Sequence, residues 1–130
     1  MEKILIVEDD PHIAELVSMH LIDAGCQVTV ESDGLAGHDR ALRETFNLLI
    51  LDINLPEMSG YDICTQVRQN LTKEESVVIA ISAEGEEALK DMKNHGADDV
   101  LLKPFTAEQL VSKLKKYLHH DDSRQIGKAS

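Results

Sequence analysis

Six polar residues stand at the ends of apolar runs in this sequence, and their side chains could act together: Glu8, Asp9, Asp10, Asp52, Ser82 and Lys103. Carboxylate oxygens are the ligands that Mg²⁺ prefers, and several carboxylates repel one another unless a cation joins them. A lysine ammonium and a serine hydroxyl suit the oxygens of a phosphoryl group. These groups are a sufficient set for phosphoryl transfer, which depends mainly on positioning and charge stabilisation.

The six residues would meet if the apolar runs before them were neighbouring strands. Five runs have the length and composition of strands: residues 3–7, 27–31, 47–51, 77–81 and 98–102. The first, third and fourth are almost continuous in Ile, Leu and Val, which predicts strands covered on both faces. In an open parallel sheet, function belongs at the carboxyl ends of the strands, where the six candidates fall.

Segments with helical periodicity separate these runs. Apolar residues recur at three- and four-residue steps from Ile13 to Ala24 and from Leu110 to Leu118, which predicts amphipathic helices. The signals for helix ends are Asp10 before Pro11, Ser59 with Asp62, Thr106 with Gln109, Gly25 and Gly96. The second helix, over residues 35–44, has the weakest pattern, because Gly37 costs about 1 kcal/mol relative to alanine. We expect His38, within it, to be a core histidine with a hydrogen-bond partner rather than a ligand.

Strand and helix alternate five times, which predicts an α/β fold with a parallel sheet, right-handed crossovers and helices on both faces. Five strands in this pattern indicate a flavodoxin-like doubly wound sheet of order 2-1-3-4-5. We expect one folded unit over residues 1–119. Residues 120–130 are polar and without periodicity, and are expected to be a tail or the start of a linker.

Composition excludes several classes of function. The chain has 130 residues and a formal net charge of -11, which argues against direct nucleic-acid binding by this domain. No apolar run approaches the ~20 residues of a membrane helix, and no signal peptide precedes the first strand. We therefore expect a cytoplasmic protein without a membrane partner. Cys26 and Cys64 show no metal-ligand or redox spacing, which predicts free thiols.

The ordered motifs of the chain resemble those of the receiver domains of bacterial response regulators. The matching segments are ILIVEDD at residues 4–10, LDINLPEMSG at 51–60, SAE at 82–84, and GADD at 96–99 leading to KPFT at 103–106. The resemblance covers residues 2 to 119. It implies a switch in two-component signalling.

The resemblance also implies roles for individual residues. Asp52 would accept a phosphoryl group from a phosphohistidine. Asp9 and Asp52 would bind Mg²⁺ through their carboxylates, Asn54 through its backbone carbonyl and Glu8 mostly through water. Ser82 and Lys103 would hold phosphoryl oxygens. The domain would catalyse only its own phosphorylation and dephosphorylation, and so would not be an enzyme acting on separate substrates.

Partners follow from the same resemblance. The phosphoryl donor would be a sensor histidine kinase or a phosphotransfer protein. The receiver would act on a downstream protein, on an output domain in a longer chain, or on a second copy in a phosphorylation-dependent homodimer. The face that changes would comprise the fourth helix, the last strand and the fifth helix, about residues 86–118. One departure affects this readout: Val100 stands where many members carry an aromatic switch residue.

Two finer expectations also rest on the resemblance. The Lys103–Pro104 peptide bond is expected to be cis, which would aim the lysine at the site. Asn54 and Glu84 lie two residues beyond the phosphoacceptor and two beyond the hydroxyl. A polar pair of modest size here is similar to that of chemotaxis-type receivers and implies a short-lived phosphorylated state.

Three alternatives remain open from the sequence. A phosphorylation-independent interaction module could keep this fold, although the complete set of site residues argues against it. An aspartate-nucleophile phosphatase would need a second aspartate at position 54, where this chain has asparagine. A flavin-binding protein would need a phosphate-cradling loop after the first strand, and the three carboxylates at Glu8, Asp9 and Asp10 would repel a phosphate.

Overall fold

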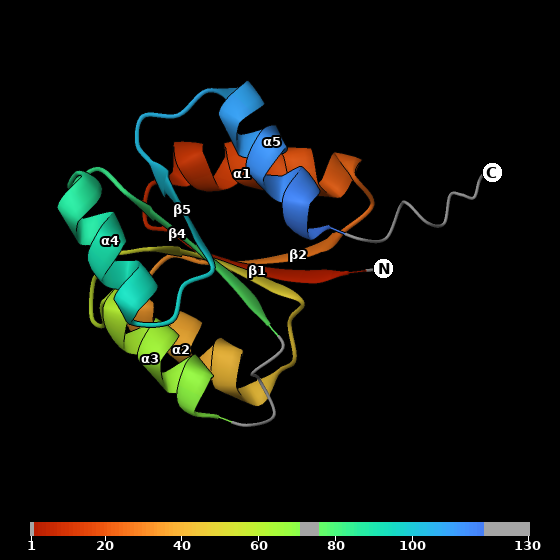
Figure 1. Ribbon diagram of the computed structural model, residues 1–130. Helices are drawn as coiled ribbons and strands as arrows, with labels where there is room; N and C mark the ends of the chain where they lie inside the picture. Colours follow the sequence, from red (N-terminus) through yellow and green to blue (C-terminus); the bar gives the residue numbers. More distant parts are fainter. Residues whose placement is uncertain (1, 71–75, 119–130) are drawn as a thin grey trace.

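The computed structural model describes residues 2–70 and 76–118, which fold into five strands alternating with five helices (Figure 1). The strands are β1 (Lys3–Val7), β2 (Gln27–Glu31), β3 (Leu48–Asp52), β4 (Val77–Ser82) and β5 (Asp99–Leu102). The helices are α1 (Pro11–Asp23), α2 (Gly34–Arg43), α3 (Gly60–Gln69), α4 (Glu86–Asn94) and α5 (Ala107–Tyr117).

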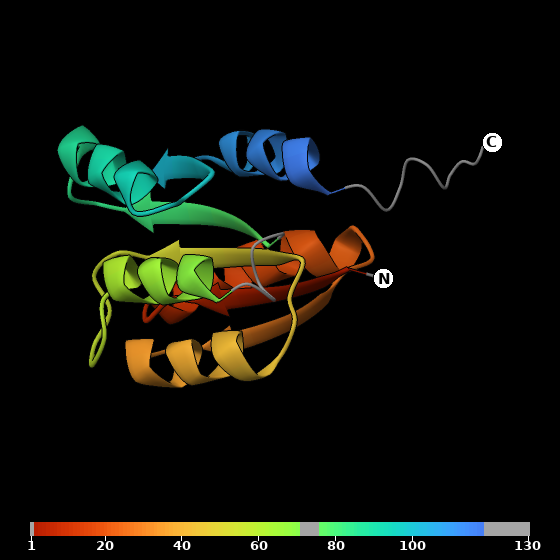
Figure 2. The ribbon, with the colours of Figure 1, turned by 60° about the horizontal axis from the view of Figure 1, so that its bottom comes forward.

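The sheet is parallel throughout and has the order β2-β1-β3-β4-β5. This order confirms the predicted doubly wound, flavodoxin-like fold. Helices α1 and α5 cover one face of the sheet, and α2, α3 and α4 cover the other (Figure 1). Because the strands run the same way, their arrowheads point to one edge, which is visible in Figure 2. Residues that end different strands are thereby brought to the same edge.

The central strands carry the core on both faces. Leu5, Val7, Leu49 and Leu51 pack on the side of α2, α3 and α4. The alternate residues, Ile4, Ile6, Leu48 and Ile50, pack on the side of α1 and α5. Full burial of each such side chain contributes about 1.5–3 kcal/mol. This two-sided burial explains why β1 and β3 are almost continuous apolar runs. Neither Cys26 nor Cys64 forms a disulfide bond, as predicted, and both are buried.

The helix signals have the predicted geometry. Asp10 caps α1, its Oδ1 accepting a hydrogen bond of 2.9 Å from the His12 N–H, with Pro11 at the first helical position. The Ser59 side chain caps α3, and Thr106 with Gln109 forms a complete capping box at α5. Beyond α1 and α4, Gly25 and Gly96 adopt positive φ values of 90° and 109°, the conformation that ends a helix most readily at glycine.

The packing of helix α2 accounts for the glycine inside it, and one prediction about this helix is corrected. A Cβ at Gly37 would lie 2.6 Å from Val7 Cγ1, so the glycine lets α2 pack directly on β1. His38 was expected to have a hydrogen-bond partner, and that prediction is wrong: its Nε2 is buried with none.

In three strands, the ends differ from the sequence-based bounds by one residue. β3 starts at Leu48 and includes Asp52, β4 extends to Ser82, and β5 starts at Asp99. Asn47 precedes β3, and its side chain accepts a hydrogen bond from the Lys3 N–H. The predicted polar tail, residues 120–130, lies outside the described residues. No helix among the described residues is long and apolar enough to cross a membrane.

Candidate phosphoacceptor site

Four elements deliver the candidate residues to one edge of the sheet. Glu8 follows β1 directly, Asp52 ends β3 and Ser82 ends β4. Ser82 pairs with Leu102 in the parallel register, and the Lys103 N–H donates to the Ser82 carbonyl at 2.8 Å. Strand pairing therefore fixes the backbone of each site residue relative to the next.

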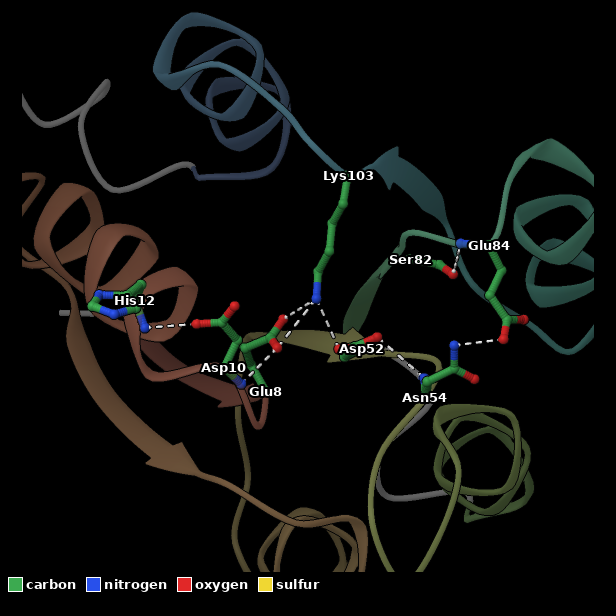
Figure 3. Close-up of polar contacts among 8 residues, drawn as sticks. All are labelled: Glu8, Asp10, His12, Asp52, Asn54, Ser82, Glu84 and Lys103. Atoms are coloured by element: carbon green, nitrogen blue, oxygen red, sulfur yellow. Dashed lines mark hydrogen bonds and ion pairs between the residues drawn. The ribbon is translucent and has the colours of Figure 1, made fainter.

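The Lys103 ammonium joins the two buried carboxylates (Figure 3). Its Nζ lies 2.9 Å from Asp52 Oδ2, and 2.9 and 3.2 Å from the Glu8 oxygens Oε1 and Oε2. Glu8 is 1% exposed and Asp52 is 4% exposed. The second Asp52 oxygen, Oδ1, accepts a hydrogen bond of 3.1 Å from the Asn54 N–H. Asp52 is thus held from both sides by residues that the sequence singled out.

The charges of this cluster do not balance. Burial raises the pKa of Glu8 to about 7, and the neighbouring Asp52 adds to the shift, against hydrogen bonds from the Asp10 N–H and from Lys103. Burial lowers the pKa of Lys103, but its hydrogen bonds to Asp52 and Glu8 outweigh burial and raise it overall. Glu8 Oε1, although paired ionically with Lys103, is buried without a hydrogen bond. One ammonium therefore serves two buried carboxylates.

The same edge fits a hard divalent cation. Carboxylate oxygens of Glu8, Asp9 and Asp52 lie within 4.8 Å of one another. Asp9 is exposed, so one ligand faces solvent while the other two come from the buried cluster. Oxygen-only donors with room for water are the set that Mg²⁺ takes in proteins. Asp10 is not part of this group, because its carboxylate caps α1.

Two loops are joined beside the phosphoacceptor candidate. Ser82 is fully buried, and its Oγ accepts a hydrogen bond of 2.9 Å from the Glu84 N–H. The Glu84 carboxylate in turn accepts a hydrogen bond of 2.6 Å from Asn54 Nδ2. Figure 3 shows these groups on the side of Asp52 away from Glu8. The loops after β3 and β4 are therefore linked through the two residues expected to affect phosphoryl lifetime.

The structure also tests expectations for β5 and for the residues that follow it. The Lys103–Pro104 peptide bond is cis, as predicted. Val100 is partly buried and packs against the core on the α4 side of the sheet.

One cluster was missed by sequence reasoning. Asp99, buried in β5, binds Lys113 and Tyr117 of α5 at 2.6 and 2.9 Å. A carboxylate inside a buried strand was the available signal, together with a lysine and a tyrosine at i, i+4 on the helix that covers it.

Comparison with known proteins agrees with the fold. The family model of the response regulator receiver domain matches residues 4–115. The chain therefore belongs to the family of response regulator receiver domains, proteins of two-component signalling. This membership confirms the resemblance found in the sequence.

Individual relatives are similar over nearly the whole chain. The response regulator ArlR of Staphylococcus epidermidis is 36% identical over 127 residues, 97% of this chain and 57% of that protein. The chain thus spans little more than half the length of this relative. The chemotaxis response regulator CheY4 of Vibrio cholerae is 32% identical with a TM-score of 0.83, covering 91% of this chain and 99% of that one.

A further solved structure bears on the metal. The receiver domain of a sensor histidine kinase from Pseudomonas aeruginosa, crystallised with a magnesium ion in its active-site cleft, is 26% identical. Its TM-score is 0.80, and the match covers 89% of this chain and 96% of that one.

Proposed function

We propose that this chain is a phosphorylation-dependent switch whose phosphoacceptor is Asp52. The observation that carries the proposal is the geometry of that carboxylate. It is buried, it lies 2.9 Å from the Lys103 ammonium, and it shares a potential cation site with Glu8 and Asp9. A structural salt bridge would need one carboxylate for one lysine, whereas here Lys103 pairs with two buried carboxylates, and the carboxylate of Asp9 lies close to both of them.

The transfer would run from a phosphohistidine to Asp52. A carboxylate oxygen of Asp52 forms a bond to phosphorus as the phosphorus–nitrogen bond breaks, and the electron pair of that bond stays on the donor imidazole. Lys103 is placed to pair with an oxygen of the transferred group, and the Ser82 hydroxyl to donate a hydrogen bond to another. The product is an acyl phosphate on Asp52, which water later hydrolyses.

The metal ligands would be the carboxylates of Asp9 and Asp52 and the backbone carbonyl of Asn54, with Glu8 acting mostly through water. When bound, Mg²⁺ would neutralise charge on the phosphoryl oxygens. The donor would be a sensor histidine kinase or a phosphotransfer protein, met in the cytoplasm. The receiver would catalyse only changes to its own Asp52.

The phosphorylation signal would leave through α4, β5 and α5. A phosphoryl group adds a charge of about -1.5 to -2, which would draw the Ser82 loop and Lys103 toward it. Both are bonded to the end of β5, through the pairing of Ser82 with Leu102 and the Lys103 N–H. Val100, which has no ring to rotate, would hardly move. Amide shifts with and without a phosphoryl mimic would test this, and changes confined to the opposite face would contradict it.

The signal would pass to a downstream protein, to an output domain in a longer chain or to a second copy of this receiver domain. We propose residues 1–119 as the receiver unit, with residues 120–130 as a tail or linker.

The decisive experiment is intact mass spectrometry after treatment with a small phosphodonor and Mg²⁺. Wild type should gain one phosphoryl group, Asp52→Ala should gain none, and a chelator should prevent labelling of wild type. Asp99→Asn, which alters a buried carboxylate distant from the site, is the matched control and should label normally. Full labelling of Asp52→Ala would refute the assignment. An unlabelled wild type would favour the phosphorylation-independent interaction module.

A further inference from the structure

An open hollow lies between the start of α2 and the loop that follows β3, two segments that lie side by side (Figure 2). Its volume is about 520 Å³, and its lining comprises Asp33, Leu35, Ala36, His38, Asp39 and Glu57. We call these six residues and the space between them the α2 hollow. None of the residues assigned to the phosphoacceptor site lines it, so it is a separate surface.

The two sides of the α2 hollow are held together by backbone contacts. The Gly34 N–H donates a hydrogen bond of 2.7 Å to the Pro56 carbonyl. A Cβ at Gly34 would collide with the Met58 carbonyl oxygen, so glycine is needed for the loop to approach α2 this closely. The hollow is therefore already formed in the free chain, and a partner would not have to order these two segments on binding.

The charge of the α2 hollow is negative and only partly compensated. Asp39 pairs with Arg43, which is outside the lining, at 2.7 Å. Asp33 and Glu57 have no ion pair within the described part of the chain. The hollows along β5 and α5 differ, because each of them has at least one lysine in its lining. A basic group should therefore be drawn to the α2 hollow rather than to those.

The α2 hollow also offers an apolar contact and a nitrogen without a partner. Leu35 is 57% exposed, one of the few large apolar side chains among the described residues that reach solvent. His38 lines the hollow, and its Nε2 is buried without a hydrogen bond. Covering Leu35 would remove apolar surface from water, and a polar group brought to His38 would satisfy that nitrogen. Both features are expected of a surface that a partner covers.

The spacing of the carboxylates decides what kind of occupant fits. They do not converge on one ion, because in the described part of the chain the only acidic group close enough to share a metal ion is the one at the phosphoacceptor site. A polypeptide with several basic side chains can pair with carboxylates that lie apart, and can add an apolar contact. We infer that the α2 hollow docks a basic segment of a partner protein, which brings arginine or lysine to Asp33 and Glu57 and an apolar side chain to Leu35.

Other occupants suit the α2 hollow less well. Nucleic acid and anionic lipid would be repelled, because the hollow is acidic and the formal net charge of the chain is -11. A second copy would bring an equally acidic chain, and the two net charges would repel each other. A basic segment is attracted both by the hollow and by the chain as a whole.

Docking at the α2 hollow goes beyond the proposed switch. The hollow lies on α2 and on the loop after β3, away from the proposed output surface of α4, β5 and α5. Its shape and charge are present in the unphosphorylated chain, so a basic segment should bind before and after phosphorylation. Asp52→Asn, which cannot be phosphorylated, should bind as wild type does.

The test titrates a short blocked peptide, with two arginines on each side of a leucine, into the isotopically labelled full chain with Mg²⁺ present. One control peptide has glutamine for each arginine, and another has alanine for the leucine. The arginine–leucine peptide should move the amide signals of residues 33–39 and 54–59 and the ring signals of His38, and should bind more tightly than either control. Raising the salt to about 1 M, where the screening length is about 3 Å, should remove the advantage of the arginines.

Variants make the assignment specific. Glu57→Lys should weaken binding of the arginine–leucine peptide about fivefold. Asp33→Asn should weaken it less, because asparagine removes the charge but still caps α2. Glu15→Lys, the same charge reversal on an exposed residue of α1, is the matched control and should bind as wild type does. Leu35→Ala should weaken binding about threefold, whereas Met19→Ala, at a similarly exposed apolar side chain of α1, should not.

Diffuse attraction to an acidic chain would give a different pattern. Equal binding of the arginine and glutamine peptides, shifts confined to other parts of the chain, or equal weakening by Glu57→Lys and Glu15→Lys would overturn the proposal. So would self-association of the chain through this hollow in preference to peptide binding. The switch and the docking site fail separately: peptide binding without labelling of Asp52 would leave docking standing alone, and labelling without binding would leave the switch.

Discussion

Two buried carboxylates of this molecule face lysines at opposite ends of the sheet: Asp52 at the carboxyl end of β3 and Asp99 at the amino end of β5. Asp99 accepts hydrogen bonds from Lys113, from the Tyr117 hydroxyl and from the Val100 N–H, at 2.6, 2.9 and 2.8 Å. Asp52 accepts from Lys103 and from the Asn54 N–H, but shares Lys103 with the buried Glu8.

The pKa values of Asp99 and Glu8 are shifted in opposite directions, which reflects the difference between the two clusters. Burial raises the pKa of Asp99, but its bonds to Lys113, Val100 and Tyr117 outweigh burial and lower it overall. At the other end, burial raises the pKa of Glu8 to about 7. The negative charge of Asp99 is compensated by its hydrogen-bond donors, so this cluster needs no bound cation. The Asp52 cluster has more negative charge than the protein compensates, as expected where a bound cation completes a functional site.

The largest expected effect comes from removing each lysine. Lys103→Gln should lower the free energy of unfolding by about 3 kcal/mol, because Glu8 and Asp52 remain buried without a cation. Lys113→Gln should cost about 1 kcal/mol, because Asp99 keeps Tyr117 and Val100 and the Lys113 side chain is already 26% exposed. Urea unfolding with a chelator present measures both. Equal losses would mean that the two clusters are equally compensated.

The next effect comes from neutralising each acid. Asp99→Asn should lower the free energy of unfolding by about 2 kcal/mol, because two side-chain donors lose a charged acceptor. Asp52→Asn should cost nothing or stabilise the chain by up to about 1 kcal/mol, because it relieves repulsion with Glu8. The two variants make the same chemical change, so each is the control for the other. A loss of stability in Asp52→Asn as large as in Asp99→Asn would contradict the comparison.

Acid should remove the contribution of Asp99. Its folded-state pKa lies below the ordinary value of 3.8. The folded form therefore holds the charged state more strongly than the unfolded chain does. Its stabilisation is present above pH 3.8 and is lost as the pH falls through the folded-state pKa. The stability difference between wild type and Asp99→Asn should accordingly be constant near neutrality and shrink below about pH 3.8. A difference that does not shrink in acid would mean that Asp99 contributes through packing alone.

A smaller effect is expected from Mg²⁺. A ligand that binds only the folded state at ten times its dissociation constant stabilises by about 1.4 kcal/mol. Wild type and Asp99→Asn should both gain this stability, whereas Asp52→Asn should gain less, because it lacks one carboxylate ligand. Thermal unfolding with Mg²⁺ and with chelator measures the gain. An undiminished gain in Asp52→Asn would place the cation elsewhere.

The same comparison shows what the sequence could predict. The fold followed from apolar runs, because strands buried on both faces must be apolar throughout, as in β1 and β3. The grouping of Glu8, Asp52 and Lys103 followed from topology, because parallel strands bring their carboxyl ends to one edge. Their chemical roles stay predictions until labelling and metal binding are measured.

Side-chain partners were harder to predict. Periodicity places Lys113 on a helix face, but it does not say whether a long side chain reaches an acid in the strand beneath. His38 was expected to follow the rule that buried polar atoms find partners, and its Nε2 does not. Asn54 and Glu84 were paired for their positions, but their hydrogen bond depends on two loop conformations that spacing does not determine. Long-range contacts between side chains of different elements therefore needed the structure.

The smallest effect concerns the lifetime of the phosphorylated state. Asn54 and Glu84 join the loops beside Asp52 by a hydrogen bond of 2.6 Å, and both are exposed. An amide and a carboxylate in this position can orient a water in line with the acyl phosphate, whereas a basic or bulky side chain would divert or exclude it. Glu84→Lys or Asn54→Arg should therefore lengthen the lifetime several-fold, a change in barrier of less than about 1.4 kcal/mol.

Phosphorylation itself should survive these substitutions, because both leave Asp52, Lys103 and the metal carboxylates in place. The decay of the phosphorylated mass after removal of the phosphodonor gives the lifetime, and Lys113→Gln at the other cluster is the control that should decay as wild type does. If the two loop variants also decay at the wild-type rate, the loops do not control access of water. The charge surplus around Asp52 would then determine the lifetime of the signal as well as its formation.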